Sequence, residues 1–235
     1  VYLYDDDDQD AGENYTRLGQ RLNTWLSSQT AAGTLFETDL RLRPNGDSGL
    51  LAVSVDSFRD YQLDKAWVWE HQALTRARFC AGDPAVGARF EEIRREILCR
   101  QRDLTKLKEE VVAMRRKMYD AHASKSETLF DLKHDPGGII DVEFIVQYLV
   151  LGHAHQHQRL TGNLGNIALL RIAAELRLIP ADQAEAAGDA YREYRRLQHA
   201  KRLSANPKGY SERESIEKYI AAVNMLWTTV FREET

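Results

Sequence analysis

The chain has 235 residues, of which 43% are hydrophobic and 29% charged, and its formal net charge is −4. This composition is typical of a globular protein with a real core and excludes wholesale disorder. Residues 1–14 hold six acidic residues and no basic one, so the rest of the chain is nearly neutral. A nearly neutral body gives little support to nucleic-acid binding, which usually needs a basic face. Two cysteines are too few for a disulfide framework. With neither a signal peptide nor a membrane-spanning stretch visible, we expect a cytoplasmic protein without membrane contact.

The N-terminal segment combines the end of a strand with an amphipathic helix. Residues 1–4 are apolar and aromatic and open without a turn, so we interpret the chain as a fragment truncated at its N-terminus. The four acids Asp5–Asp8 repel one another and are expected to form a solvated loop. The helix predicted over 12–28 has apolar residues at three- and four-residue steps, namely Tyr15, Leu18, Leu22, Trp25 and Leu26.

A period of two predicts a strand over residues 35–42. One face of this strand would carry Phe36, Thr38, Leu40 and Leu42, and the other would carry Glu37, Asp39, Arg41 and Arg43. The composition of residues 44–49 predicts a turn. Residues 50–54 are then expected to return as the second strand of a hairpin.

Everything after Asp56 is predicted to be helical. Residues 58–79 lack glycine and proline, and Trp67 and Trp69 within them are expected in the core. A seven-residue spacing predicts one long helix or two nearly collinear ones, with a buried row of Phe90, Ile97, Leu104, Val111 and Met118. Further helices are expected at about 139–153, 164–178, 181–204 and 211–232. The predicted fold class is therefore α+β and mostly helical, with one domain over 1–84 and a helical bundle over 85–235.

The charged face of the predicted strand at 35–42 has two interpretations. It is either a solvent-facing strand edge with weak ion pairs or the floor of a site for phosphate chemistry. In the second case a carboxylate would hold Mg²⁺ and the arginines would hold a polyphosphate, followed by a turn that lets the backbone approach a phosphate closely. Periodicity alone leaves both interpretations open.

The amino-acid sequence of this region resembles the glutamine synthetase adenylyltransferase family. The resemblance includes Phe36-Glu37-Thr38-Asp39-Leu40-Arg41-Leu42-Arg43-Pro44 and Ser48-Gly49-Leu50-Leu51. It continues, in order, through residues 15–21, 67–78, 130–133, 137–144 and 147–151, and beyond residue 160 it becomes general helical character.

The resemblance implies a partial nucleotidyltransferase domain, like that of DNA polymerase beta, followed by an all-helical domain. In such enzymes three carboxylates hold Mg²⁺ against the phosphates of ATP. By this resemblance Asp39 is the third carboxylate, acting as metal ligand and possible base, and Glu37 is a second candidate ligand. The other two family carboxylates would precede Val1. We predict nucleotide binding by Arg41, Arg43, Ser48, Gly49 and Lys133, with structural pairing to Glu37 as the alternative for either Arg41 or Arg43.

Family members carry two halves, one that attaches AMP to a tyrosine of glutamine synthetase and one that removes it by phosphorolysis. The blocks at 48–51, 67–72 and 147–151 look more like the attaching, C-terminal half, and the removing half is the alternative. The resemblance also implies the partners glutamine synthetase and the PII signalling protein, with glutamine as an effector. A further alternative is a non-catalytic helical module that docks PII. With only Asp39 of the three carboxylates, the fragment alone is expected to be inactive.

A second constellation combines Lys133, Asp141 and Glu143 near a predicted helix start. The acids either cap this helix and pair with Lys133, or they line a nucleotide cleft together with it. His153, His155 and His157 alternate at the end of the same helix, and without a third ligand on one face we expect a surface cluster rather than a zinc site.

Overall fold

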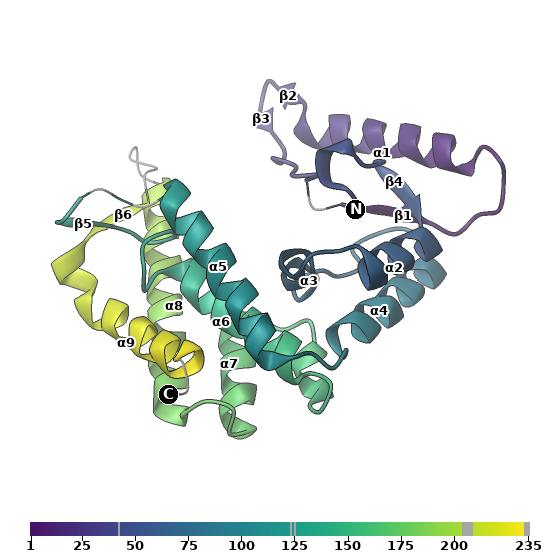
Figure 1. Ribbon diagram of the computed structural model, residues 1–235. Helices are drawn as coiled ribbons and strands as arrows, with labels where there is room; N and C mark the ends of the chain where they lie inside the picture. The colour runs from purple at the N-terminus through teal and green to yellow at the C-terminus, as the bar shows by residue number, and fades with distance from the viewer. Residues whose placement is uncertain (42, 123, 125, 204–208, 233–235) are drawn as a thin grey trace. The chain divides into compact units, whose positions relative to one another are not determined.

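The computed structural model describes residues 1–41, 43–122, 124, 126–203 and 209–232 (Figure 1). The fold is mostly helical with short strands, as the sequence predicts. Its internal contacts divide the chain into two compact units, Val1–Ile97 and Leu98–Thr235. Within the described ranges, no helix combines the length and the apolar character needed to cross a bilayer.

The first unit is built on a short parallel sheet that helices cover. Its elements are β1 (Tyr2–Tyr4), α1 (Ala11–Ser27), β2 (Gln29–Thr30), β3 (Gly33–Thr34), η1 (Gly46–Ser48), β4 (Ala52–Ser54), α2 (Val55–Asp64), α3 (Val68–Leu74) and α4 (Pro84–Leu98). Strand β1 runs parallel to β4, with Tyr2 opposite Ala52. Helices α1 and α2 both contact this sheet, and Figure 1 shows them on opposite sides of it. The buried side chains of Val55 and Phe58 contribute to the core beneath α2.

The strand predicted over 35–42 and its hairpin are wrong. Residues 35–41 are irregular, Leu42 lies outside the described residues, and β4 pairs with β1 instead of returning along 35–42. The physical reason is that this segment bonds to helix α1. The backbone N–H of Phe36 donates to the Leu26 carbonyl at 2.9 Å, and the Thr38 hydroxyl donates to the Asn23 side chain. Phe36, predicted on the buried face, is 58% exposed.

The uninterrupted helix predicted over 58–79 is also wrong, because α2 ends at Asp64 and α3 begins at Val68. A buried carboxylate causes the break. Glu70 accepts hydrogen bonds from the Trp67 backbone N–H and from the Tyr61 hydroxyl, each at 3.1 Å. An acid three residues after a helix start satisfies a backbone donor there, so a new helix begins without glycine or proline. Trp67, expected in the core, is 68% exposed.

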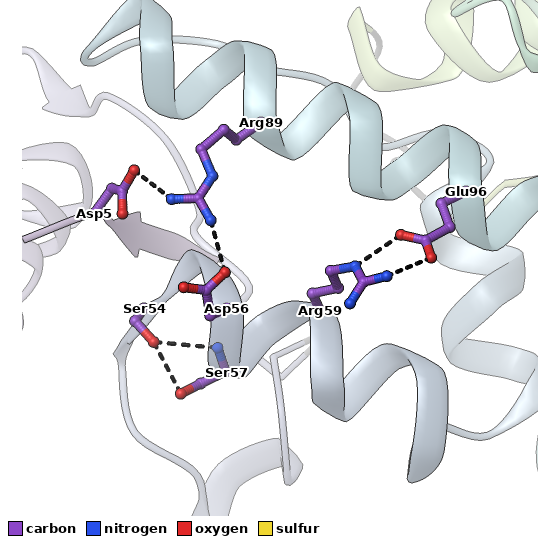
Figure 2. Close-up of polar contacts among 7 residues, drawn as sticks. All are labelled: Asp5, Ser54, Asp56, Ser57, Arg59, Arg89 and Glu96. Atoms are coloured by element: carbon purple, nitrogen blue, oxygen red, sulfur yellow. Dashed lines mark hydrogen bonds and ion pairs between the residues drawn. The ribbon is translucent and has the colours of Figure 1, made fainter.

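Helix α4 packs within the first unit through two arginine contacts. Figure 2 shows Arg89 of α4 between Asp5, which follows β1, and Asp56 at the start of α2. It also shows Arg59 of α2 paired with Glu96 of α4 at 2.6 Å. The compact unit therefore extends through α4 to Ile97. The domain division at residue 84 stays a prediction about family domains.

The second unit is a helical bundle with one short antiparallel strand pair. Its elements are α5 (Leu104–His122), β5 (Leu129–Asp131), α6 (Ile139–His153), η2 (Gln158–Thr161), α7 (Asn166–Glu175), α8 (Ala181–Leu203), β6 (Tyr210–Glu212) and α9 (Arg213–Phe231). The helices predicted at 139–153, 164–178, 181–204 and 211–232 are confirmed within a few residues, and residue 204 lies outside the described ranges. Strands β5 and β6 were not predicted.

Helix α6 forms the centre of this bundle. It contacts α5, α7, α8 and α9 (Figure 1), and nearly all of its side chains are buried. A helix that is apolar on every side needs such enclosure. The predicted heptad row is split between two helices, because the α-helix stops at Leu98 and resumes at Leu104. Ile97 and Val111 are buried as predicted, whereas Leu104 is 40% exposed and Met118 is half-buried.

Candidate active site

Asp39 and Arg41 form a bidentate ion pair in the irregular segment after β3. The Arg41 guanidinium donates to Asp39 from Nη2 at 2.6 Å and from Nε at 3.0 Å, and the Arg41 backbone N–H donates to the same carboxylate at 3.0 Å. These bonds, the side-chain ones first, lower the pKa of Asp39 to about 2. Both side chains remain more than half exposed. Asp39 is thus a carboxylate of lowered pKa that is open to solvent.

Glu37 lies beside this pair. Residues 37–41 together line one open hollow on the surface. The sequence interpretation placed Glu37, Asp39 and Arg41 on one strand face, and the structure brings them to one hollow without a strand.

The predicted nucleotide-binding residues of the following loop hold that loop together. The Arg43 guanidinium donates to the Gly49 carbonyl at 3.3 Å and to the Leu40 carbonyl at 2.5 Å. The Ser48 hydroxyl donates to the Asn45 carbonyl at 2.8 Å. A Cβ on Gly49 would lie 1.8 Å from the Pro44 carbonyl oxygen, so only glycine fits there. The phosphate contacts of Arg43, Ser48 and Gly49 stay a prediction.

A cavity of about 330 Å³ in the first unit lies next to Arg43. Its apolar wall includes Phe58, Leu74 and Phe90, and Arg43 and Arg76 bring positive charge to its lining. Apolar walls with a few polar groups are typical of small-molecule sites. Arg76 follows the end of α3 at Leu74, whereas the sequence placed it inside the uninterrupted helix predicted over 58–79.

A buried arginine fixes the backbone before Arg76. Arg94 of α4 is 3% exposed, and its guanidinium donates to the carbonyls of Leu74 at 2.8 Å and Thr75 at 3.1 Å. These carbonyls end α3, where backbone acceptors lose their regular helical partners, and the Leu74 carbonyl also accepts the Ala77 N–H at 3.2 Å. Arg94 therefore caps α3 and holds the residues that lead into the cavity.

The described residues do not complete a Mg²⁺ site. The carboxylate oxygens of Asp39 and Glu37 are the donor type that Mg²⁺ prefers. Within the described part of the chain, however, no three His, Cys, Asp or Glu side chains converge closely enough to hold a metal ion. His153, His155 and His157 are each half-buried, and their assignment to a surface cluster stays a prediction.

In the second unit, Lys133 stands on a loop between β5 and α6. The Lys133 side chain is exposed. Its backbone N–H donates to the Asp131 carboxylate at 2.8 Å, and its carbonyl accepts from the Ile140 N–H at 3.2 Å. The structure thus fixes the backbone of Lys133 and leaves its ammonium group open to solvent.

The side chains that contact Asp141 and Glu143 are those of Arg115 and Tyr191, respectively, and not the predicted Lys133. Asp141 is 4% exposed, pairs with Arg115 of α5 and accepts the Gly137 backbone N–H at 2.5 Å. Burial raises the pKa of Asp141, and the Arg115 charge opposes that rise. Glu143 accepts a hydrogen bond from the Tyr191 hydroxyl at 3.2 Å. Asp141 thus binds the backbone just before the N-cap Gly138 rather than the first N–H groups of α6, and its cationic partner is Arg115, which sequence reasoning missed.

Two family models match this chain, each over a different part of it. Residues 3–93 match the family model described as glutamate-ammonia ligase adenylyltransferase. Residues 105–209 match the family model described as GlnD PII-uridylyltransferase.

Curated relatives cover almost the whole chain. It is 64% identical over 234 residues to a protein of Aromatoleum aromaticum, covering 98% of this chain and 24% of the relative. It is 61% identical over 208 residues to a protein of Nitrosomonas europaea, covering 88% of this chain and 22% of the relative. It is 55% identical over 235 residues to a protein of Bordetella bronchiseptica, covering 100% of this chain and 25% of the relative. Each relative is named bifunctional glutamine synthetase adenylyltransferase/adenylyl-removing enzyme, and the chain spans about a quarter of their length.

Proposed function

Because the chain belongs to the family of bifunctional glutamine synthetase adenylyltransferase/adenylyl-removing enzymes, we propose that it is part of an enzyme that transfers AMP from ATP to glutamine synthetase. The acceptor is a tyrosine hydroxyl and pyrophosphate leaves. The observation that carries this proposal is the identity of 64% over nearly the entire chain. The sequences at residues 48–51, 67–72 and 147–151 favour the adenylylating half of the enzyme over the adenylyl-removing half. No feature of the described residues favours the phosphorolytic half.

The first unit would form part of a nucleotidyltransferase domain of the DNA polymerase beta type. The support is its match to the adenylyltransferase family model, together with the parallel β1–β4 pair between helices. Arg41, Arg43, Ser48 and Gly49 would lie near the phosphates of ATP. The apolar wall at Phe58 and Phe90 is suited to an uncharged part of the nucleotide.

Asp39 is proposed as a ligand of Mg²⁺, with Glu37 as a second candidate and the remaining ligands outside this chain. Bound Mg²⁺ would stabilise negative charge on the phosphate oxygens. A carboxylate with a pKa of about 2 is a poor acceptor for the proton of a phenol whose pKa is about 10. Asp39 therefore acts through its charge, and the sequence-based alternative of a general base is disfavoured.

Regulation is proposed to involve the helical unit. Its match to the PII-uridylyltransferase family model supports a link to the PII protein, and glutamine would be the effector. The proposed location of the whole enzyme is the cytoplasm, and its cofactor and substrate are Mg²⁺ and ATP.

The test is AMP transfer by the full-length enzyme carrying Asp39→Asn. Labelled AMP transferred from ATP to glutamine synthetase should fall by about a hundredfold or more, as when a charge partner of phosphoryl transfer is lost. Stability should be unchanged, because an exposed ion pair contributes little to folding. Asp60→Asn, on the exposed surface of α2, is the control and should retain activity. Near-normal transfer by Asp39→Asn would refute the assignment.

A further inference from the structure

The cavity of the first unit contains an unused hydrogen-bond acceptor. The side chain of Gln62, on α2, lines this cavity and is 5% exposed. Its Oε1 atom is buried and has no hydrogen-bond partner among the described residues. An amide oxygen that leaves water without gaining a donor destabilises the fold. Such an atom in the lining of a cavity indicates a ligand that supplies the donor.

The backbone of Gln62 is held in place from α3. The carbonyl of Gln62 lies in the last turn of α2, where a helix leaves its acceptors without regular partners. It accepts a hydrogen bond from Nε2 of His71 at 2.9 Å, and His71 is 4% exposed. Because a carbonyl can only accept, Nε2 of this imidazole carries the proton. The residue that presents the unused oxygen is thereby fixed between two helices before any ligand binds.

The walls of the cavity are suited to a flat, apolar group. Phe58 of α2 and Phe90 of α4 line it, and their ring centroids are 5.9 Å apart. Aromatic side chains offer faces and edges against which a planar ring packs well. The volume of about 330 Å³ is at the lower end of the range of about 300–1,000 Å³ that small-molecule sites occupy. A cavity of this size suits one part of a nucleotide rather than the whole molecule.

A buried carboxylate decides which part of the nucleotide that is. Glu70 also lines the cavity and is 7% exposed. Its carboxylate accepts hydrogen bonds from the Tyr61 hydroxyl and the Trp67 backbone N–H, each at 3.1 Å. A negative charge in a poorly solvated place repels a second anion strongly. The cavity therefore disfavours phosphate groups and favours an uncharged base that carries hydrogen-bond donors.

Arg43 connects the cavity with the hollow of residues 37–41, both within the first unit. Its side chain lines the cavity, and its guanidinium donates to the Leu40 carbonyl at 2.5 Å. Leu40 in turn lines the hollow, where Arg41 lies. The two spaces are therefore neighbours, one largely apolar and the other charged. A nucleotide whose phosphates lie near Arg41 and Arg43 can place its base in the cavity.

We propose that this cavity binds the base of the nucleotide and that Oε1 of Gln62 accepts a hydrogen bond from the exocyclic amino group of adenine. The inference rests on the proposed function and deepens it, because it assigns the residue that selects the base. Glutamine side chains pair with the amino group of adenine in DNA by the same chemistry. Gln62 is thus a specificity-determining residue, separate from the residues proposed near the phosphates.

The experiment compares two nucleotides on the full-length enzyme by calorimetry. They are ATP and purine riboside triphosphate, which carries hydrogen in place of the amino group. The wild-type enzyme should bind ATP about tenfold more tightly or better, because the analogue leaves Oε1 of Gln62 unpaired. Gln62→Leu should weaken ATP binding by about tenfold and leave analogue binding unchanged, so the preference disappears. Gln20→Leu, at an exposed glutamine of α1, is the matched control and should retain the preference.

Two further variants test the fold and the place of the base. Gln62→Leu removes an unpaired buried oxygen, so the urea midpoint of the enzyme should not fall. Gln62→Met, an unbranched substitute, provides the same binding test if the leucine variant unfolds. Ala73→Leu adds volume to the α3 wall of the cavity and should weaken ATP and the analogue alike. Binding of tripolyphosphate, which has no base, should not respond to Ala73→Leu.

The outcomes separate the two proposals. Equal binding of ATP and the analogue by the wild-type enzyme overturns this inference, as does a Gln62→Leu variant that keeps the preference or weakens both nucleotides equally. Unchanged ATP binding in Ala73→Leu places the base elsewhere and also overturns it. Absence of AMP transfer by the wild-type enzyme, with a preference for ATP that still depends on Gln62, overturns the proposed function instead.

Discussion

At the scale of single residues, the charge of Asp39 depends on its neighbour two positions along the chain. Arg41 supplies the bonds that lower the pKa of Asp39 to about 2. The pair stabilises the fold above the ordinary pKa of an aspartate and loses that effect as the pH falls toward 2. Because both side chains are largely exposed, the contribution to folding is small. The contact matters for the ionisation of Asp39 rather than for stability.

Replacing Arg41 by Gln should therefore raise the pKa of Asp39 toward the ordinary value of about 4. The measurement is an NMR titration of the aspartate carboxyl carbons between about pH 1.5 and about pH 6, a range that contains both values. A pKa of Asp39 that stays near 2 in the variant would show that another group holds the carboxylate ionised.

Arg94 has the opposite character, because its guanidinium is buried and donates to backbone carbonyls, with Glu91 at 3.5 Å as its acidic partner. Arg94→Met should destabilise the first unit by about 1–3 kcal/mol, since it removes a buried donor from the carbonyls of Leu74 and Thr75. The free energy of unfolding in urea measures this. Arg95→Met, one residue along the same helix and exposed, should change that free energy by less than about 0.5 kcal/mol. Equal effects of the two substitutions would contradict the capping role of Arg94.

At the scale of elements, two glycines of the second unit differ in the space that a side chain would have. Gly188 lies inside α8, where a Cβ would meet Ile167 at an ordinary 3.6 Å. Gly188→Ala should therefore raise the free energy of unfolding by about 0.5–1 kcal/mol. Gly138→Ala should lower it by about 1–3 kcal/mol, because the new Cβ would press on the Leu132 carbonyl. Thermal or urea unfolding of both variants tests the signs, and the same sign for both would be inconsistent with this packing.

The helices of the second unit could be predicted because their signals are local. The apolar run of α6 and the breaks before it and around Pro180 can be identified in a few neighbouring residues. The strands predicted at 1–4 and 50–54 are confirmed as β1 and β4, but the pairing of the strands could not be predicted, since each is short and its partner is distant in sequence. Tyr2 pairs with Ala52, and Asp131 pairs with Tyr210. Alternation at residues 35–42 resembles a strand, but backbone pairing decides the structure, and there the bonds go to α1.

The candidate site was predictable only in part for the same reason. The wording around Asp39 identifies a family segment, and the structure brings Glu37, Asp39 and Arg41 to one hollow. Arg115 was missed because its partner Asp141 is 26 positions away, and nothing in an amphipathic helix marks which arginine is buried. The burial of Arg94 by the end of α3 depends on the same kind of distant contact.

At the scale of the whole molecule, the two compact units correspond to two family models. The adenylyltransferase model covers 3–93 within the first unit, and the PII-uridylyltransferase model covers 105–209 within the second. The predicted catalytic residue Asp39 and the predicted nucleotide-binding residue Lys133 therefore belong to units that match different family models. An enzyme assembled in this way can change its transfer chemistry and its helical module independently.

The last prediction concerns the 235-residue chain by itself, which should not transfer AMP. Phosphoryl chemistry with two metal ions needs several carboxylates to replace water around Mg²⁺. The described residues offer Asp39 and Glu37 in one hollow, but no group of three side chains that could hold a metal ion. Arg41 adds positive charge beside Asp39, which further disfavours a bare cation.

The measurement is transfer of labelled AMP from ATP to glutamine synthetase by the chain alone, with a full-length relative as the positive control. The chain spans about a quarter of its relatives, so the missing ligands have room elsewhere in the enzyme. Robust transfer by the chain would mean that the metal site is misplaced. Asp5–Asp8 would then be examined first, although Asp5 is already paired with Arg89 and Asp6 accepts the Tyr15 hydroxyl. Those contacts occupy two of the four acids with partners from α1 and α4, which is why we place the chemistry at Asp39 instead.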